Sequence, residues 1–153
     1  MKKLLWTLLL LLPSLSAQQW SIGYWTPWGN PGVPISGIQW DGLTHVVQWG
    51  ALVKADGTLD LTTNNFSANA PTLIAAAHSA NVKVILGLTQ PYWQGQTTNY
   101  QQAVTNNRAA FVSNVMKVVN TYGFDGVDID WEPFSGGTNG AGGAVVVLVV
   151  DVV

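Results

Sequence analysis

Residues 122–133 read YGFDGVDIDWEP and concentrate the acidic residues of this chain. Only 9% of all residues are charged, and half of the eight acidic ones stand in this stretch: Asp125, Asp128, Asp130 and Glu132. Side chains alternate along a β-strand, so every second residue shares a face. As a strand, the stretch would place its last three acids on one face and three apolar side chains on the other: Val127, Ile129 and Trp131.

Two other interpretations of the stretch fit less well. An exposed edge strand with its charges in water conflicts with the rarity of aspartate in strands and with the apolar residues opposite, which need burial. A calcium loop of the EF-hand type would need a central glycine and further oxygen ligands. We therefore expect a buried row of acids about 6.5–7 Å apart along the strand. Asp125, of the other parity, is expected to lie outside this row as a turn or helix-end residue.

Like charges held this close cannot all ionise, so some of these acids are expected to keep a proton near neutral pH. If the stretch is a strand of a βα barrel, a protonated carboxyl at its carboxyl end can act as a general acid toward a leaving group. Glu132 is placed for that role.

The first seventeen residues, MKKLLWTLLLLLPSLSA, have the layout of a secretory signal peptide, with a basic start, an apolar run and a small residue before the cleavage site. The apolar run is shorter than the roughly 20 residues that span a bilayer. We expect residues 1–17 to be removed and the protein to be secreted, extracellular or periplasmic, with no membrane association afterwards. An uncleaved anchor is the alternative.

Composition excludes several classes of function. Beyond residue 17, eight acidic residues face four basic ones, which argues against nucleic acid as a partner. Cysteine is absent, so neither disulfides nor cysteine-bound zinc are available. We expect no cofactor and no metal. His45 is predicted to be a core or strand residue, and His78 to face solvent on an outer helix.

Apolar runs and helical stripes alternate along the chain. Strands are predicted near 20–26, 43–50, 82–88 and 125–132. A helix is predicted over 71–80 with Pro71 at its first position, and another over 108–122, ending at Gly123. This order is typical of βα units around a parallel sheet. A complete (β/α)8 TIM barrel takes about 250 residues, so this α/β chain is predicted to hold about the first four units.

The end of the chain has a different composition. Residues 135–143, SGGTNGAGG, are predicted to form a glycine-rich linker, and residues 144–153, AVVVLVVDVV, an atypical valine-rich tail. A parallel fifth strand would need a crossover of a dozen or more residues, usually helical, which the glycines do not provide. We expect the tail not to be that strand and favour a truncated or frame-shifted reading. A native C-terminal strand is the alternative.

The motif DGVDIDWE closely resembles the D-G-x-D-x-D-x-E signature of glycoside hydrolase family 18, the chitinases and their relatives. GYWTPW (23–28), THVVQWGAL (44–52) and KVILGL (83–88) resemble the first three strands of the family. The resemblance covers about 20–134, and it identifies residues 18–134 as the N-terminal half of the family's catalytic domain. One departure is GLTQPYW (87–93), where the family usually has a serine and paired glycines.

The resemblance implies a role for each acid and a substrate, chitin or N-acetylglucosamine oligosaccharides with β-1,4 linkages. Glu132 would protonate the glycosidic oxygen, Asp130 would orient the substrate's acetamide, and Asp128 would share a proton with Asp130 and tune it. The acetamide carbonyl, rather than an enzyme carboxylate, would attack the sugar, giving an oxazolinium intermediate and retention of configuration.

Aromatic residues near the strand ends are expected to lie against the apolar faces of the sugars: Tyr24, Trp28 and Trp93. Trp49 and Trp131 are expected to pack in the fold, which is the commoner role of tryptophan. Three alternatives stay open: a non-catalytic carbohydrate-binding member, an endo-β-N-acetylglucosaminidase or peptidoglycan hydrolase, and a fragment that folds only with a second copy. Asn65–Phe66–Ser67 is the lone N-glycosylation sequon and matters only in a glycosylating host.

Overall fold

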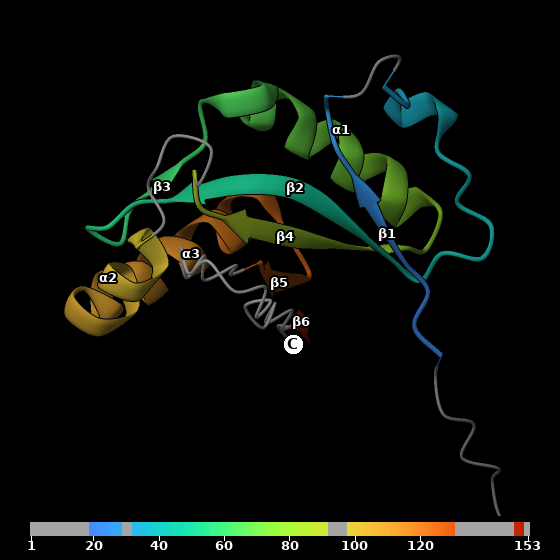
Figure 1. Ribbon diagram of the computed structural model, residues 1–153. Coiled ribbons are helices and arrows are strands. Elements are labelled where there is room, and N and C mark those ends of the chain that lie inside the picture. Colours follow the sequence, from blue (N-terminus) through green and yellow to red (C-terminus); the bar gives the residue numbers. More distant parts are fainter. Residues whose placement is uncertain (1–18, 29–31, 92–97, 131–148, 152–153) are drawn as a thin grey trace, which may run out of the picture.

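The computed structural model describes residues 19–28, 32–91, 98–130 and 149–151. Strands alternate with helices along most of this length (Figure 1). The strands are β1 (Ile22–Trp25), β2 (His45–Val53), β3 (Leu59–Asp60), β4 (Lys83–Thr89), β5 (Gly126–Ile129) and β6 (Val149–Asp151). The helices are α1 (Phe66–Ser79), α2 (Asn99–Asn106) and α3 (Arg108–Tyr122), with short 3-10 turns η1 (Ile35–Gly37) and η2 (Thr63–Asn65).

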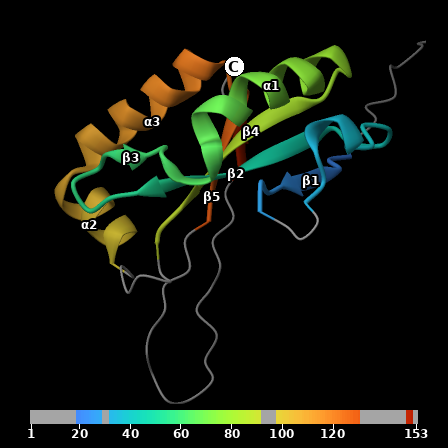
Figure 2. The same ribbon diagram turned by 90° about the horizontal axis from the view of Figure 1, so that it is seen from above.

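Four strands form a parallel sheet in the order β1-β2-β4-β5, which is their order along the chain. All four match strands predicted from the sequence. Helices α1 and α3 lie side by side on one side of the sheet, which Figures 1 and 2 both show. Consecutive parallel strands joined by helices on one side are the arrangement of a βα-barrel wall, so the predicted fold class is confirmed.

Alternate residues of each strand build the core between the sheet and the helices. Val46 of β2, Leu86 of β4 and Val127 of β5 pack in one cluster with Leu73 of α1 and Phe111 of α3. Burying a leucine or phenylalanine side chain fully stabilises the fold by about 1.5–3 kcal/mol relative to leaving it exposed. The residues between them point to the other side of the sheet, which we call the inner face.

The helix boundaries agree with the sequence for α3 and differ for α1. Helix α3 spans the predicted residues, and Gly123 follows it with φ 84°, the left-handed conformation that glycine adopts readily after a helix. Helix α1 begins at Phe66, so the prediction that Pro71 occupies its first position is wrong. Phe66 and Ala70 are buried against the core, and their burial outweighs the backbone hydrogen bond lost at the proline.

Helix α2 was not predicted from the sequence, and strand β6 lies in the tail that was expected not to form a parallel fifth strand. Helix α2 depends on tertiary contacts, because the Asn99 side chain donates a hydrogen bond to the carbonyl of Val53 and the Tyr100 backbone N–H donates one to Gln90. Strand β6 pairs antiparallel with β5, so part of the valine-rich tail does form a strand, although not a parallel one. The predicted linker over 135–143 lies outside the described residues.

Strand β3 follows the turn at Gly57, and it pairs antiparallel with β2. His45 is buried in β2 and His78 is exposed on α1, as expected for both. Within the described ranges, no helix has both the length and the apolar character needed to cross a bilayer.

Candidate active site

The structure describes two members of the predicted acidic row, of which Asp128 is buried and Asp130 is partly exposed. Val127 belongs to the helix-side core, while Asp128, the next residue, is fully buried with 0% of its surface exposed and points to the inner face. Asp130 follows β5 directly, and its backbone N–H donates a hydrogen bond to Leu88 of β4, so the strand pairing holds it in place. Glu132 and Trp131 lie outside the described residues.

A hydrogen bond across the inner face connects β1 and β5, the first and last of the four parallel strands. The Tyr24 hydroxyl of β1 donates to Oδ2 of Asp128 on β5 at 2.8 Å. Two strands lie between them, and three strand spacings in a flat sheet would separate β1 from β5 by about 14 Å. The short contact therefore requires the sheet to curl toward its inner face, as the wall of a barrel does.

Burial governs the ionisation of both partners. Desolvation raises the pKa of the Asp128 carboxyl, and the hydrogen bond from Tyr24 offsets part of that rise. No hydrogen-bond partner for Oδ1 of Asp128 exists among the described residues, so this oxygen is free to carry a proton. Burial, the bond to Asp128 and the neighbouring acid charges raise the pKa of Tyr24, which keeps its hydroxyl protonated as the donor.

Tyr100 is a neighbour of the acids that the sequence did not reveal. It is fully buried at the start of α2, and its pKa is raised well above the ordinary value by burial first and then by the negative charges of Asp130 and Asp128. An available signal was its position shortly after β4, since segments that follow the carboxyl ends of parallel strands surround the same site. Two polar residues at the carboxyl end of β4, Thr89 and Gln90, are also buried, and their position likewise indicates that this segment borders the site.

Three aromatic rings gather at the carboxyl end of β1, beside the middle of β2. The Trp49 ring lies 6.4 Å from that of Tyr24 and 6.2 Å from that of Trp28, edge to face with the latter. Tyr24 and Trp28 are 50% and 47% exposed, so both offer a surface to a ligand. Trp49 packs against them, in agreement with the packing role expected for it, although the sequence did not indicate which rings it would contact. Trp93 lies outside the described residues.

Gly87 opens the stretch that departs from the family pattern, and the glycine itself has a steric reason. Gly87 pairs in register with Asp128, so it lies on the inner face beside the acids. A Cβ at this position would come within 2.9 Å of the Gln48 carbonyl oxygen and 3.0 Å of a Val47 methyl group. Strand β2 approaches β4 so closely here that no side chain fits.

Asp125 lies outside the acidic row, as its parity predicts. Its Oδ2 accepts a hydrogen bond from the Val84 backbone N–H at 2.7 Å and lies 2.8 Å from Nε2 of His78. Asp125 thus links the start of β5 to β4 and to α1. Within the described ranges, no group of three or more histidine and acidic side chains is arranged to hold a metal ion.

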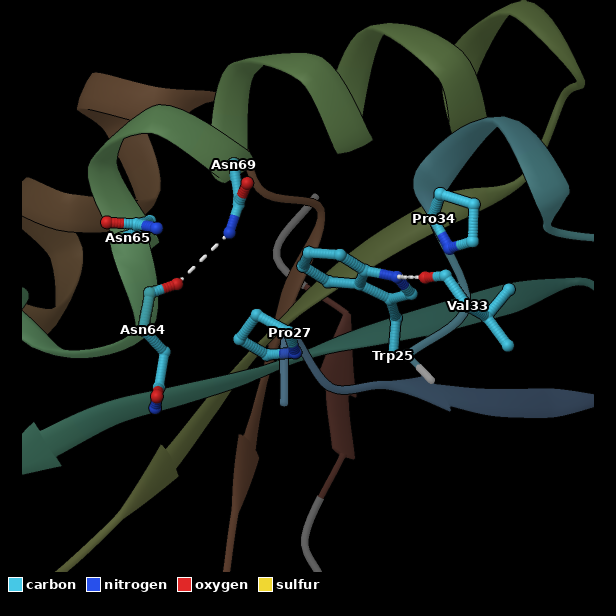
Figure 3. A pocket seen from close by; sticks show the side chains of 8 residues that line it. Trp25, Pro27, Val33, Pro34, Asn64, Asn65 and Asn69 are labelled. Carbon is cyan, nitrogen blue, oxygen red and sulfur yellow. Dashed lines mark hydrogen bonds between the residues drawn. The ribbon is translucent and has the colours of Figure 1, made fainter. Parts of the chain in front are cut away.

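A pocket of about 530 Å³ opens on the helix side of β1 (Figure 3). Trp25 lies at its centre and donates its indole N–H to the Val33 carbonyl. The rest of the lining includes Pro27, Pro34 and asparagines of η2 and α1. Trp25 packs in the helix-side core and has the opposite parity to Tyr24. The pocket is therefore separate from the acids of the inner face.

A parallel βα wall with a buried carboxyl on its inner face, and exposed aromatic rings at the carboxyl end of its first strand, defines a protein of the βα-barrel class. The family model of glycosyl hydrolases family 18 matches residues 21–142. The chain belongs to this family.

Individual relatives agree with this assignment. A chitinase-like effector from Moniliophthora roreri is 29% identical over 130 residues, covering 84% of this chain and 31% of that protein. Chitinase 1 from Aphanocladium album is 28% identical over 137 residues, covering 71% and 30%. The crystal structure of a chitinase from Bacteroides thetaiotaomicron superimposes with a TM-score of 0.68 at 26% identity, covering 78% of this chain and 37% of that one. The chain thus spans about a third of the length of these relatives.

Proposed function

We propose that this chain carries the acidic row of a secreted chitinase-like glycoside hydrolase that cleaves β-1,4-linked N-acetylglucosamine polymers with retention of configuration. The observation that supports it most is the buried Asp128 carboxyl, held by Tyr24 on the inner face, with Asp130 two residues further along. Glu132 has the same parity, so an extended chain would present it on the same face.

Each acid has a distinct part in the proposed reaction. Glu132 donates its proton to the glycosidic oxygen, whose bond to the anomeric carbon breaks so that the leaving sugar departs as an alcohol. The substrate's acetamide oxygen attacks the anomeric carbon and forms an oxazolinium ion. Asp130 orients the acetamide and stabilises its positive charge. Water then attacks the anomeric carbon and opens the oxazolinium ring. A proton of this water returns to Glu132, so that the acid is restored and the configuration at the anomeric carbon is retained.

Asp128 and Tyr24 prepare Asp130 in this proposal. Because the pKa of Asp128 is raised by burial, Asp128 can hold a proton and share it with Asp130 as charge develops on the substrate. Tyr24 fixes one carboxylate oxygen, which leaves the other free to face its neighbour. The half-exposed rings of Tyr24 and Trp28 offer flat surfaces to the sugar.

A second candidate function is carbohydrate binding without hydrolysis. It is favoured by the relatives in Moniliophthora roreri and Moniliophthora perniciosa, which are described as chitinase-like effectors rather than as chitinases. Such a protein would use the aromatic cluster to bind the oligosaccharide but would not turn it over.

Product analysis by NMR tests the proposal and separates the two candidates. Incubated with N-acetylglucosamine oligosaccharides, the protein is expected to release the β-anomer first and to leave cello-oligosaccharides, which lack the acetamide, intact. An α-anomer as the first product, or equal cleavage of cello-oligosaccharides, would contradict substrate assistance. Binding of the N-acetylglucosamine oligosaccharide without any cleavage would replace the first candidate with the second.

A further inference from the structure

The sequon Asn65–Phe66–Ser67 stands where η2 meets α1, at the carboxyl-end side of the sheet. Its middle residue is 2% exposed and anchors the turn in the core, whereas Asn65 and Ser67 on either side are exposed. The folded chain can therefore carry a glycan on Asn65 without unpacking Phe66, and the Ser67 hydroxyl accepts a hydrogen bond from Tyr122.

The Asn65 side chain does not cap helix α1. Asparagine before a helix often caps it, accepting a hydrogen bond from a backbone N–H of the first turn. Asn65 instead has φ 53° and ψ 33°, the left-handed conformation, and makes no side-chain capping bond. The neighbouring Asn64 is also left-handed, at φ 57°, and the Asn69 side chain donates a hydrogen bond to its carbonyl.

Open space adjoins the Asn65 side chain. Asn65 lines the pocket of about 530 Å³ together with Trp25, Pro27 and Asn69. Figure 3 shows it at the rim, on the side away from Val33 and Pro34. A sugar attached there would meet proline and indole surfaces and side-chain amides, all of them uncharged.

We propose that Asn65 is an acceptor of an N-linked oligosaccharide. The amide nitrogen of Asn65 forms a bond to C1 of the first sugar of a lipid-pyrophosphate-linked oligosaccharide, the amide loses a proton, and the lipid pyrophosphate leaves. The attached glycan projects from the outer, helix-covered side of the sheet, so the inner face with Asp128 stays accessible. The inference rests on entry of the chain into a secretory pathway, which the proposed signal peptide provides.

Translation of the full chain in the presence of endoplasmic-reticulum microsomes tests the site, because transfer occurs before folding and does not need a stable product. We expect one mobility shift that peptide N-glycosidase removes, and in heavy-oxygen water the same enzyme should convert Asn65 to labelled aspartate. Asn65→Gln and Ser67→Ala should both abolish the shift. Asn64→Gln, one residue away but outside the sequon, should keep it.

The proposal assumes that residues 1–17 direct import and that Asn65 accepts the glycan. A second protein, in which a leader known to be imported by the microsomes replaces residues 1–17, tests these two assumptions separately. A shift with this leader only would show that Asn65 is a competent acceptor and that the native leader fails. An imported chain whose Asn65 stays unmodified would overturn the proposal, as would a shift that survives both Asn65→Gln and Ser67→Ala.

Discussion

The contact between Tyr24 and Asp128 carries most of the chemistry that the structure describes. A phenol donates to one oxygen of a fully buried carboxyl, and the other oxygen has no partner among the described residues. Burial raises the pKa of Asp128, while the bond from Tyr24 favours its ionised form. The protonation of Asp128 is thus set by two opposing effects, of which burial is the larger.

Removing the phenol hydroxyl should raise the pKa of Asp128 further. Tyr24→Phe keeps the ring but deletes the donor that stabilises the carboxylate, so only the desolvation remains. Carbon-detected NMR titration of the Asp128 carboxyl measures the change directly. Tyr122→Phe, which removes a hydroxyl bonded to Ser67, is the matched control and should leave the titration unaltered. An Asp128 pKa that falls in Tyr24→Phe would contradict the described bond.

The raised pKa of Asp128 also predicts a pH dependence of stability. The folded protein binds this proton more tightly than the unfolded chain, so the stabilisation is complete below the unfolded pKa of about 3.9 and is lost as pH rises through the folded value. Between the two pKa values the loss is about 1.4 kcal/mol per pH unit. Urea unfolding at pH values between the two pKa values should show this loss of unfolding free energy for the wild type. The same loss should be missing from Asp128→Asn. Equal slopes for both proteins would mean that Asp128 is not desolvated.

The role of Tyr24 in this contact was not predictable from its local sequence. Tyr24 was expected to lie against sugar, and its exposed half is still available for that, but its hydrogen-bond partner stands 104 residues away. Only the curvature of the assembled sheet brings the two together. The burial of Asp128, by contrast, follows from its place in an alternating strand with an apolar opposite face.

At the scale of the elements, periodicity predicted the parallel strands and α3, because their apolar residues repeat at the strand and helix periods. It placed the start of α1 at Pro71, since proline is favoured at a first helical position. The structure begins α1 at Phe66, where tertiary burial overrides that preference. Helix α2 escaped prediction for a related reason, because side-chain bonds to distant carbonyls and amides hold its first turn.

Phe66→Ala tests this account of α1. Phe66 is 2% exposed and its ring packs near those of Tyr122 and Phe124, so truncation leaves a cavity and should cost about 3–5 kcal/mol of unfolding free energy. Urea unfolding followed by tryptophan fluorescence gives the value. Val112→Ala on α3, where the side chain is 53% exposed, should change the stability by no more than about 0.5 kcal/mol. Similar losses in both variants would mean that α1 is not anchored at Phe66.

At the scale of the molecule, four parallel strands form a wall with helices on one side (Figure 2). The Asp128 carboxyl lies on its inner face, where Tyr24 binds it. The family and the fold could be predicted from the sequence, because the acidic motif and the βα order occur together. Tyr100 and the packing of Trp49 against the exposed rings could not, since both depend on how loops bring distant residues to the strand ends. The proposed roles of Glu132 and Trp93 remain predictions from sequence.

Hydrolysis of a fluorogenic N,N′-diacetylchitobioside by the protein without residues 1–17 tests the central proposal most directly. We predict measurable turnover that Glu132→Gln abolishes, because glutamine cannot donate the proton that the glycosidic oxygen needs. Asp41→Asn removes an exposed carboxylate far from the acidic motif in sequence and should retain the wild-type rate. Turnover that survives Glu132→Gln, or its absence from a folded wild-type protein, would contradict the account of this chain as a hydrolase.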